Sequence, residues 1–263
     1  TVMPEAFSGS EKTLRQLKVL YEDADILIIN KPSGMLSQKA RPEDVSANEY
    51  ILSYLLREGA LTEEEMRTFR PSVCNRLDRN TSGILIAGKT LKGLQEMSKA
   101  LKERTIQKYY RCVVKGEVLR EDYLKGWLVK DERENKVTVS TVKPKSADAA
   151  PIETAYRPIW TGGGYTGLEV HLITGRSHQI RAHLAYLGRP VLGDIKYGNR
   201  KMNERTGTKT QALCAVRVSF LDIPEENSLH YLSGKVIKLK DPQIVKQFDA
   251  LDKSKADGEN SHA

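Results

Sequence analysis

The sequence of 263 residues contains only three cysteines and no apolar run long enough to cross a membrane. Cys74, Cys112 and Cys214 are odd in number, far apart and without CxxC spacing, so neither a disulfide framework nor a zinc site is indicated. No run approaches the roughly 20 apolar residues that span a bilayer. The first residues lack the apolar core of a signal peptide. We therefore expect a cytoplasmic protein that does not enter a membrane.

Patterns that would indicate a metal, a nucleotide cofactor or a serine nucleophile are also weak. His178 and His183 lie five residues apart, whereas a helical pair of metal ligands needs i and i+4 spacing. GGGYTG (162–167) fits the dinucleotide pattern, but a strand-like segment follows it, which predicts a hairpin turn. Neither Ser82 nor Ser177 lies in a G-x-S-x-G elbow. We expect no metal and no cofactor.

Basic residues, by contrast, are in excess. Lysine plus arginine (42) exceed aspartate plus glutamate (34), which gives a formal net charge of +8 and a pI near 9.2. Two segments, 102–115 and 199–209, concentrate these cations, and the first also contains Tyr109 and Tyr110. Phosphates require positive charge and unstacked bases require flat partners, so this combination favours a nucleic acid as the partner.

Apolar segments that alternate with turn residues predict a strand-rich mixed α/β fold. The segment 26–30 reads as a strand that leads into a Lys-Pro-Ser-Gly turn. Further strands are expected over 84–89, 107–116, 154–160 and 168–173, with a short one inside 134–151. Helices are expected over 45–57, 61–69 and 177–188, and after Thr90 as the cap. In the helix after Thr90, helical spacing predicts a core-facing stripe of Leu91, Leu94, Met97 and Leu101.

One polar run, NRLDRNTSG (75–83), contains a single carboxylate directly before an apolar strand. Asp78 lies between Arg76 and Arg79. On residue chemistry alone, such an aspartate is a surface ion pair or a loop carboxylate that caps backbone donors. The residues of this run do not by themselves assign it to catalysis.

A second polar run, ITGRSHQIRAHLAYLGRPVLGD (173–194), begins with a turn and continues as a short helix. Arg176 lies where that turn precedes the helix, a position from which its guanidinium can reach a neighbouring loop. His178 and His183 are expected to form hydrogen bonds within the fold. Arg181 is expected either to do the same or to contact phosphate. Asp194 is interpreted as a turn residue.

These two runs resemble the signatures of the RluA-type pseudouridine synthases. NRLDRNTSG is similar to the family's H-R-L-D-x-x-T-S-G, and the second run is similar to T-G-R-x-H-Q-I-R-x-H followed by G-x-P-x-x-G-D-x-x-Y-G. KYY (108–110) aligns with the family's K-x-Y between them. The resemblance covers roughly residues 18 to 240 and is nearest to the RluC/RluD-like branch. Asn75 and Cys214 stand where the family has histidines.

The resemblance implies the pseudouridine synthase fold, with a central, largely antiparallel mixed sheet, flanking helices and a catalytic cleft. We expect a catalytic domain over 18–245, an N-terminal linker over 1–17 and a disordered tail over 246–263. Many family members carry a small RNA-binding S4 domain upstream, and the linker is interpreted as a remnant of the connection to such a domain. The protein is expected to be a monomer.

Position by position, the resemblance assigns Asp78 as the catalytic aspartate and Arg176 as the arginine that pairs with it. Tyr110 matches the active-site tyrosine that packs on the target base. The family's substrate-binding positions fall on Arg76, Lys108 and Ile180.

The reaction implied is the isomerisation of uridine to pseudouridine in RNA, without a cofactor. Large-subunit ribosomal RNA is the expected substrate, and tRNA is the alternative. Two other functions remain open. One is a non-catalytic RNA-binding or ribosome-assembly protein on the same scaffold, and the other is an N-glycoside hydrolase that releases uracil from RNA.

Overall fold

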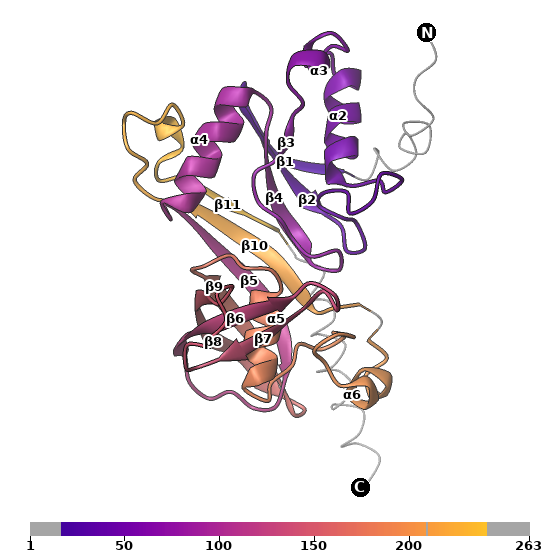
Figure 1. Cartoon of the computed structure of the whole chain (residues 1–263), viewed down its shortest axis with the longest axis vertical. Coiled ribbons are helices and arrows are strands. Elements are labelled where there is room, and N and C mark those ends of the chain that lie inside the picture. Colours follow the sequence, from indigo (N-terminus) through magenta and orange to yellow (C-terminus); the bar gives the residue numbers. More distant parts are fainter. Residues whose placement is uncertain (1–16, 209, 241–263) are drawn as a thin grey trace, which may run out of the picture. The chain divides into compact units, whose positions relative to one another are not determined.

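The computed structural model of the protein describes residues 17–208 and 210–240, which form two compact units (Figure 1). The first unit comprises residues 17–107 and 217–239, and the second comprises the remaining described residues. Except for Leu17, the predicted linker and tail lie outside the described residues. The assignment of 18–245 as one catalytic domain stays a prediction.

In the first unit, β1, β2 and β4 are antiparallel neighbours at one end of the described sheet. β2 pairs with β1 on one side and with β4 on the other, and the short β3 also pairs with β4. Nearly all side chains of β2 and β4 are buried, as expected for short, continuous apolar runs. The strands of this unit are β1 (Lys18–Glu22), β2 (Ile26–Lys31), β3 (Ser72–Val73), β4 (Ser82–Gly88) and β11 (Val236–Lys238).

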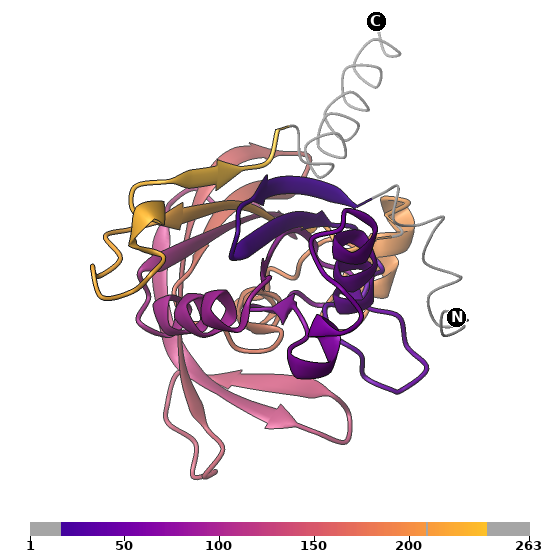
Figure 2. The ribbon, with the colours of Figure 1, turned by 90° about the horizontal axis from the view of Figure 1, so that it is seen from above.

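Helix α4 (Leu91–Lys102) packs on β4 (Figures 1 and 2). It begins at Thr90, whose hydroxyl accepts from the N–H of Gly93 at 2.9 Å, as the sequence predicts. A Cβ atom on Gly88 would come within 2.5 Å of the Leu94 Cα, so only glycine allows this close approach. The other helices of the unit are α2 (Ala47–Arg57), α3 (Glu65–Thr68) and the 3₁₀ turn η2 (His230–Leu232).

Two predictions for these helices are wrong in part. The helix expected over 61–69 is limited to α3, because Thr62 and Glu65 bond to each other in a turn that precedes it. Leu91 is 52% exposed rather than core-facing. The buried residues of α4 are Gly93, Met97 and Ala100. Two of them, Gly93 and Ala100, are small and let the helix approach the sheet closely, so a different side of the helix faces the core.

The second unit contains an antiparallel sheet in the order β5-β9-β8-β6-β7. The turn between β8 and β9 includes Gly163 and Gly164, both with positive φ, which confirms the predicted hairpin. The sequence does not predict β6, which is rich in charged residues, and it also does not predict β1, β3, β11 or the strand over Leu213–Phe220. The strands are β5 (Ile106–Lys115), β6 (Asp122–Asp131), β7 (Lys136–Ser140), β8 (Ala150–Gly162) and β9 (Tyr165–Leu172). β5 and a further strand, β10 (Leu213–Phe220), have residues in both units.

Helix α5 (Gln179–Tyr186) packs against this sheet and ends before Gly188, which has a φ of 72°. It is followed by the short helix α6 (Arg200–Arg205). An apolar cluster joins α5 to β6, β7 and β8 through Leu128, Val137, Val139, Ile152 and Ala182. The mixed α/β fold with a largely antiparallel sheet is confirmed, whereas the cleft stays a prediction. No helix in the described part of the chain is long and apolar enough to span a membrane.

Candidate active site

Asp78 lies in the loop that connects β3 to β4. Its side chain is half-buried, Arg76 is exposed, and Leu77 between them is buried. The Ser37 hydroxyl makes two hydrogen bonds to the backbone of Leu77: it accepts from the Leu77 N–H (2.9 Å) and donates to the Leu77 carbonyl (2.8 Å). The carbonyl of Asp78 accepts from the N–H of Thr81 at 3.0 Å. The backbone is therefore fixed on both sides of the Asp78 side chain.

A buried lysine holds the far side of this loop. Lys31, the last residue of β2, is 0% exposed, and its ammonium group donates to the carbonyls of Met35 (2.7 Å), Pro32 (3.0 Å) and Arg79 (3.1 Å). The Arg79 carbonyl also accepts from the N–H of Gly34 at 2.8 Å. A buried ammonium needs such partners, because desolvation without them is costly. The sequence predicts only a turn here; the available signal was a lysine at the end of an apolar strand.

The beginning of the loop is tied to β4 through the backbone of Ile86. The Ile86 N–H donates to the side-chain oxygen of Asn75 at 2.9 Å, and its carbonyl accepts from the N–H of Cys74 at 2.7 Å. Asn75, which replaces the histidine of the family signature, thus makes a structural contact in this chain. Burial raises the pKa of the Cys74 thiol to about 12, so this cysteine stays protonated and unreactive at neutral pH.

In the second unit, a buried glutamine holds the turn that carries Arg176. The side-chain oxygen of Gln179 accepts from the Arg176 N–H (3.1 Å) and from the Thr174 hydroxyl (2.8 Å). The side-chain nitrogen of Gln179 donates to the Glu153 carbonyl and to the Thr154 hydroxyl, both at 2.9 Å. All four hydrogen-bonding positions of this amide are therefore used. The Arg176 side chain itself is exposed.

Lys108, Tyr110 and Ile180 lie in the same unit as Arg176. Tyr110 and Ile180 are both buried, and Lys108 is half-buried two positions before Tyr110 on the same face of β5. A Cβ atom on Gly175 would lie 3.1 Å from the Lys108 Nζ, so the ammonium group lies against the turn that carries Arg176. Burial lowers the pKa of Lys108.

The predicted site residues are thus distributed over the two units. Asp78 and Arg76 belong to the first unit, and the structure holds their loop in place through main-chain contacts. Arg176 belongs to the second unit, where its turn adjoins Lys108. The pairing of Asp78 with Arg176 joins residues of different units, and it stays a prediction.

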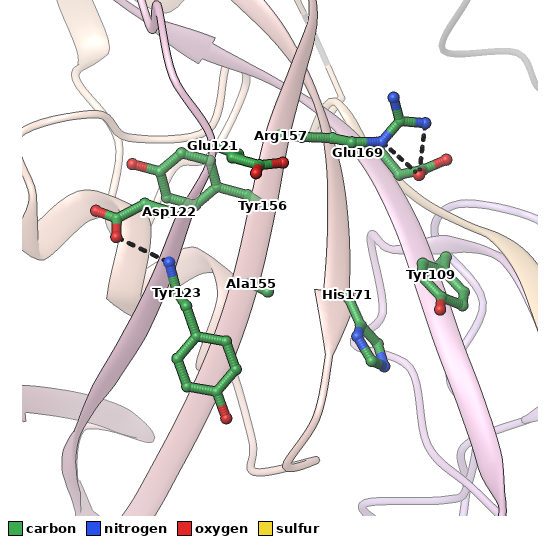
Figure 3. Close-up of a pocket in the computed structure, with 9 residues that line it drawn as sticks. All are labelled: Tyr109, Glu121, Asp122, Tyr123, Ala155, Tyr156, Arg157, Glu169 and His171. Atoms are coloured by element: carbon green, nitrogen blue, oxygen red, sulfur yellow. Dashed lines mark hydrogen bonds and ion pairs between the residues drawn. The ribbon is translucent and has the colours of Figure 1, made fainter.

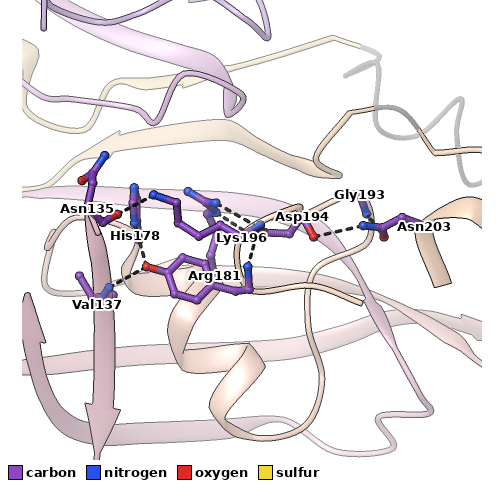
Figure 4. A network of polar contacts seen from close by, with 9 residues as sticks. Asn135, Val137, His178, Arg181, Gly193, Asp194, Lys196 and Asn203 are labelled. Atoms are coloured by element: carbon purple, nitrogen blue, oxygen red, sulfur yellow. Dashed lines mark hydrogen bonds and ion pairs between the residues drawn. The ribbon is translucent and has the colours of Figure 1, made fainter. Parts of the chain in front are cut away.

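His178, Arg181 and Asp194 of the second run belong to a network of polar contacts (Figure 4). The Arg181 guanidinium donates to both carboxylate oxygens of Asp194, at 2.6 and 3.0 Å. Asp194 also accepts from the N–H groups of Lys196 (2.8 Å) and Tyr197 (3.0 Å), so it is the turn residue that the sequence predicts. Burial alone raises the pKa of Asp194, but the hydrogen bonds and charge of Arg181 outweigh it and lower the pKa.

Both histidines of this run take part in hydrogen bonds within the fold. His178 Nδ1 lies 2.9 Å from the Tyr197 hydroxyl, which accepts from the N–H of Val137 at 2.8 Å. His183 Nδ1 lies 3.1 Å from the Thr154 hydroxyl, and burial lowers the pKa of His183. Across residues 17–208 and 210–240, no group of three or more histidine, cysteine or acidic residues is arranged to hold a metal ion.

Two solved human structures, both named for an RNA pseudouridylate synthase domain, have the same fold. Human RNA Pseudouridylate Synthase Domain Containing 4 has a TM-score of 0.72 at 19% identity, and the match covers 94% of this chain and 97% of that one. Human RNA Pseudouridylate Synthase Domain Containing 1 has a TM-score of 0.61 at 21% identity, with 90% and 95% covered. At these identities the likeness establishes the fold.

The sequence places the chain in a family. The model of the RNA pseudouridylate synthase family matches residues 25–186, more than half of the chain, so the chain belongs to this family. The predicted resemblance to the RluA-type enzymes of the RluC/RluD-like branch is confirmed. Ribosomal large subunit pseudouridine synthase D of Borreliella burgdorferi is 31% identical over 184 residues, which are 69% of this chain. The protein of the same name from Vibrio cholerae is 31% identical over 78% of this chain.

These relatives are longer than the chain. The matched part is 55% of the Borreliella burgdorferi protein and 63% of the Vibrio cholerae protein.

Proposed function

We propose that this chain isomerises uridine to pseudouridine in RNA, with Asp78 as the catalytic carboxylate. The main support is that the family match over residues 25–186 includes the run around Asp78, the tyrosine at 110 and the turn with Arg176, in the expected order. The fixed backbone on both sides of Asp78 also supports this role, because a catalytic group must be held in a productive position.

In the proposed reaction, the glycosidic bond between N1 and C1′ breaks, the uracil turns, and its C5 bonds to C1′. The C5 hydrogen leaves as a proton, and N1 gains one, so atoms and charge balance without an oxidant or a cofactor. A carboxylate is ionised at neutral pH, and it can attack C1′, attack the base or remove a sugar proton without prior activation.

The other residues have distinct proposed roles. Arg176 pairs with the Asp78 carboxylate through its positive charge and orients it. Tyr110, whose ring is buried without RNA, packs on the uracil after RNA binding uncovers it, and stacking of this kind contributes roughly 1–3 kcal/mol per base. Arg76 helps to displace the target nucleotide from its helix, and Lys108 and Ile180 line the pocket. The exposed position of Arg76 suits contact with RNA.

We further propose large-subunit ribosomal RNA as the substrate and tRNA as the alternative. The relatives in Borreliella burgdorferi and Vibrio cholerae are named as large-subunit ribosomal pseudouridine synthases, which favours the former. We also propose that the protein acts as a cytoplasmic monomer. Mapping pseudouridines in ribosomal RNA and tRNA from a strain that lacks the gene would decide between the two substrates, because only the true target loses its modification.

Chromatography of the nucleosides and free bases formed from RNA tests the activity itself. Isomerisation predicts pseudouridine with no free uracil. Release of uracil would indicate an N-glycoside hydrolase, and unchanged RNA that nevertheless binds the protein would indicate a non-catalytic RNA-binding protein. Either of these results contradicts the proposal.

A further inference from the structure

A pocket of about 510 Å³ opens on the sheet of the second unit (Figure 3). Its walls include Tyr109, Tyr123, Ala155 and His171. Ala155 directly follows Thr154, whose side chain contacts Gln179 and His183 of α5. Because successive residues of a strand point to opposite faces, the Ala155 side chain points away from α5. The pocket therefore lies on the face of the sheet that α5 leaves uncovered.

Four of the lining residues form one row across four neighbouring strands. Tyr109 of β5 is opposite His171 of β9, His171 is opposite Ala155 of β8, and Ala155 is opposite Tyr123 of β6. The rings of Tyr109 and His171 are stacked, with centroids 4.6 Å apart and planes 18° from parallel. Three positions of the row thus carry rings, and the fourth carries only a methyl group.

The methyl group of Ala155 leaves a slot between His171 and Tyr123. Neighbouring strands lie about 4.8 Å apart, so these two rings stand on strands separated by roughly 9.6 Å. A flat group on Ala155 would lie at stacking distance from the His171 ring, whose other side is stacked on Tyr109. The Tyr123 ring leans along β6, where its hydroxyl donates to Glu153 and the Lys125 ammonium lies 5.6 Å from the ring centroid. The shape of the slot therefore selects a planar group rather than a bulky one.

The charges around the slot select the sign of that group. Glu121, Asp122 and Glu169 are acidic residues of the lining, and Arg157 is its basic residue. Asp122 directly precedes Tyr123 in β6, so its side chain points to the other face of the sheet. Arg157 is already paired with Glu169, with nitrogen–oxygen distances of 3.0 and 2.9 Å. An acidic excess in a chain of net charge +8 is a local feature, and it disfavours phosphate while it favours a cation.

We propose that this slot binds the guanidinium group of an arginine from a basic segment of a partner protein. Guanidinium is planar, always charged, able to stack on aromatic rings and able to donate two parallel hydrogen bonds to a carboxylate. The ammonium of lysine shares only the charge, and a nucleobase shares only the flat shape. This interaction surface goes beyond RNA modification and does not depend on the proposed function.

The test uses the full chain and fluorescein-labelled peptides, with binding measured by fluorescence anisotropy at low salt. The peptide Gly-Arg-Gly-Arg-Gly-Arg is compared with versions in which lysine or citrulline replaces arginine. Lysine keeps the charge without the plane, and citrulline keeps the plane without the charge. We expect the arginine peptide to bind at least about tenfold more tightly than either. If the lysine or the citrulline peptide binds as tightly as the arginine peptide, the proposal is overturned.

Ala155→Leu fills the slot without entering the core, because position 155 lies on the uncovered face. We expect it to weaken binding of the arginine peptide by at least about tenfold. Thr138→Leu is the matched control, since it adds similar apolar bulk at an exposed position of β7 in the same sheet, and it should leave binding unchanged. Equal binding by Ala155→Leu and the unaltered chain would overturn the proposal.

A second variant and a second ligand complete the test. Glu169→Gln keeps the size of the side chain, removes one carboxylate of the lining and releases Arg157 from its ion pair. Both changes make the lining less negative, so this variant should also weaken binding of the arginine peptide, even if Ala155→Leu fails to fold. A labelled single-stranded RNA hexamer should bind Ala155→Leu and the unaltered chain equally. Loss of RNA affinity in Ala155→Leu would assign the slot to RNA and contradict the arginine site.

Discussion

In the first unit, a buried ammonium group holds the loop around Asp78, whereas in the second unit a buried neutral amide holds the turn around Arg176. Lys31 gathers three carbonyl groups around one charge. Gln179 satisfies two acceptor positions and two donor positions with one amide. Both side chains are 2% exposed or less. If either one is removed, bulk water cannot take its place as a hydrogen-bond partner.

The two arrangements should fail in different ways. If the ammonium group of Lys31 is removed, its three carbonyl partners stay close together without that donor. This lowers the free energy of unfolding. Loss of the Gln179 amide leaves its two acceptors with other contacts: the Glu153 carbonyl keeps the Thr174 N–H at 3.3 Å, and the Thr154 hydroxyl keeps His183 Nδ1 at 3.1 Å. The Arg176 N–H loses its hydrogen bond to Gln179, so the main cost is the position of the turn. We therefore expect the first unit to lose stability and the second to lose catalytic geometry when its holding residue is removed.

The largest effect is expected at Asp78 itself. Asp78→Asn keeps the volume and removes the charge, and an amide neither attacks nor accepts a proton at neutral pH. Tritium release from RNA labelled at uridine C5 should fall by more than about a thousandfold, or about 4 kcal/mol in the barrier. RNA binding measured by filter retention should change little. Release within about tenfold of the unaltered chain would rule out Asp78 as the catalytic carboxylate.

Removal of the buried ammonium should have the largest effect on stability. Lys31→Met keeps the apolar part of the side chain and leaves the three carbonyls without this donor, at a cost of about 3 kcal/mol. In a domain of this size, that lowers the melting temperature by roughly 6–12 °C, which calorimetry can measure.

Lys39→Met is the control for the loss of a lysine charge. Lys39 is exposed and lies 3.6 Å from Glu49, and an ion pair of this kind contributes about 0–1 kcal/mol. If Lys31→Met and Lys39→Met have the same melting temperature, the carbonyl contacts of Lys31 do not hold the Asp78 loop.

Gln179→Ala should mainly slow turnover. Without the hydrogen bond to its N–H, the Arg176 turn shifts, and misplacement by about 1 Å can cost a hundredfold in rate. We expect kcat to fall by about tenfold to a hundredfold with KM nearly unchanged, as measured by steady-state tritium release. Gln95→Ala, at a position of α4 outside its buried face, should leave both constants unaltered. A rise in KM at constant kcat would instead assign Gln179 to RNA binding.

The smallest effect is expected from His183 as the pH falls. Because burial lowers the pKa of His183 in the folded protein, the unfolded chain binds more protons between that pKa and about 6.5. The contribution of neutral His183 to stability is fully present above pH 6.5 and is lost as the pH falls through the folded pKa. Each pKa unit corresponds to about 1.4 kcal/mol.

His183→Gln keeps a polar group near Thr154 and cannot titrate. Urea unfolding between pH 5 and 7.5 should therefore show a smaller loss of stability in this variant than in the unaltered chain. Parallel curves for the two proteins would show that His183 does not titrate in the unfolding reaction over this range.

Much of the fold could be predicted because its signals are local. The apolar runs ILII and ILIA predict β2 and β4, and Thr90 predicts the start of α4. The glycines of residues 162–167 predict the β8–β9 turn, because their positive φ values are open to glycine at little cost. The charged strand β6 could not be predicted, because it has no clear apolar pattern of its own. Its pairing with β7 and β8 makes it a strand.

The family and the candidate residues can be recognised from the sequence, because the two signature runs are continuous in the chain and lie largely within the matched residues 25–186. The residues that hold these runs in place are known only from the folded structure. Lys31 meets the carbonyl of Arg79 from 48 positions away, and Gln179 meets Glu153 from 26 positions away. The aromatic row with its gap at Ala155 depends on the register of four strands. Contacts of this kind carry no periodic signal along the chain, since pairing between distant segments is set by the packing of the whole sheet.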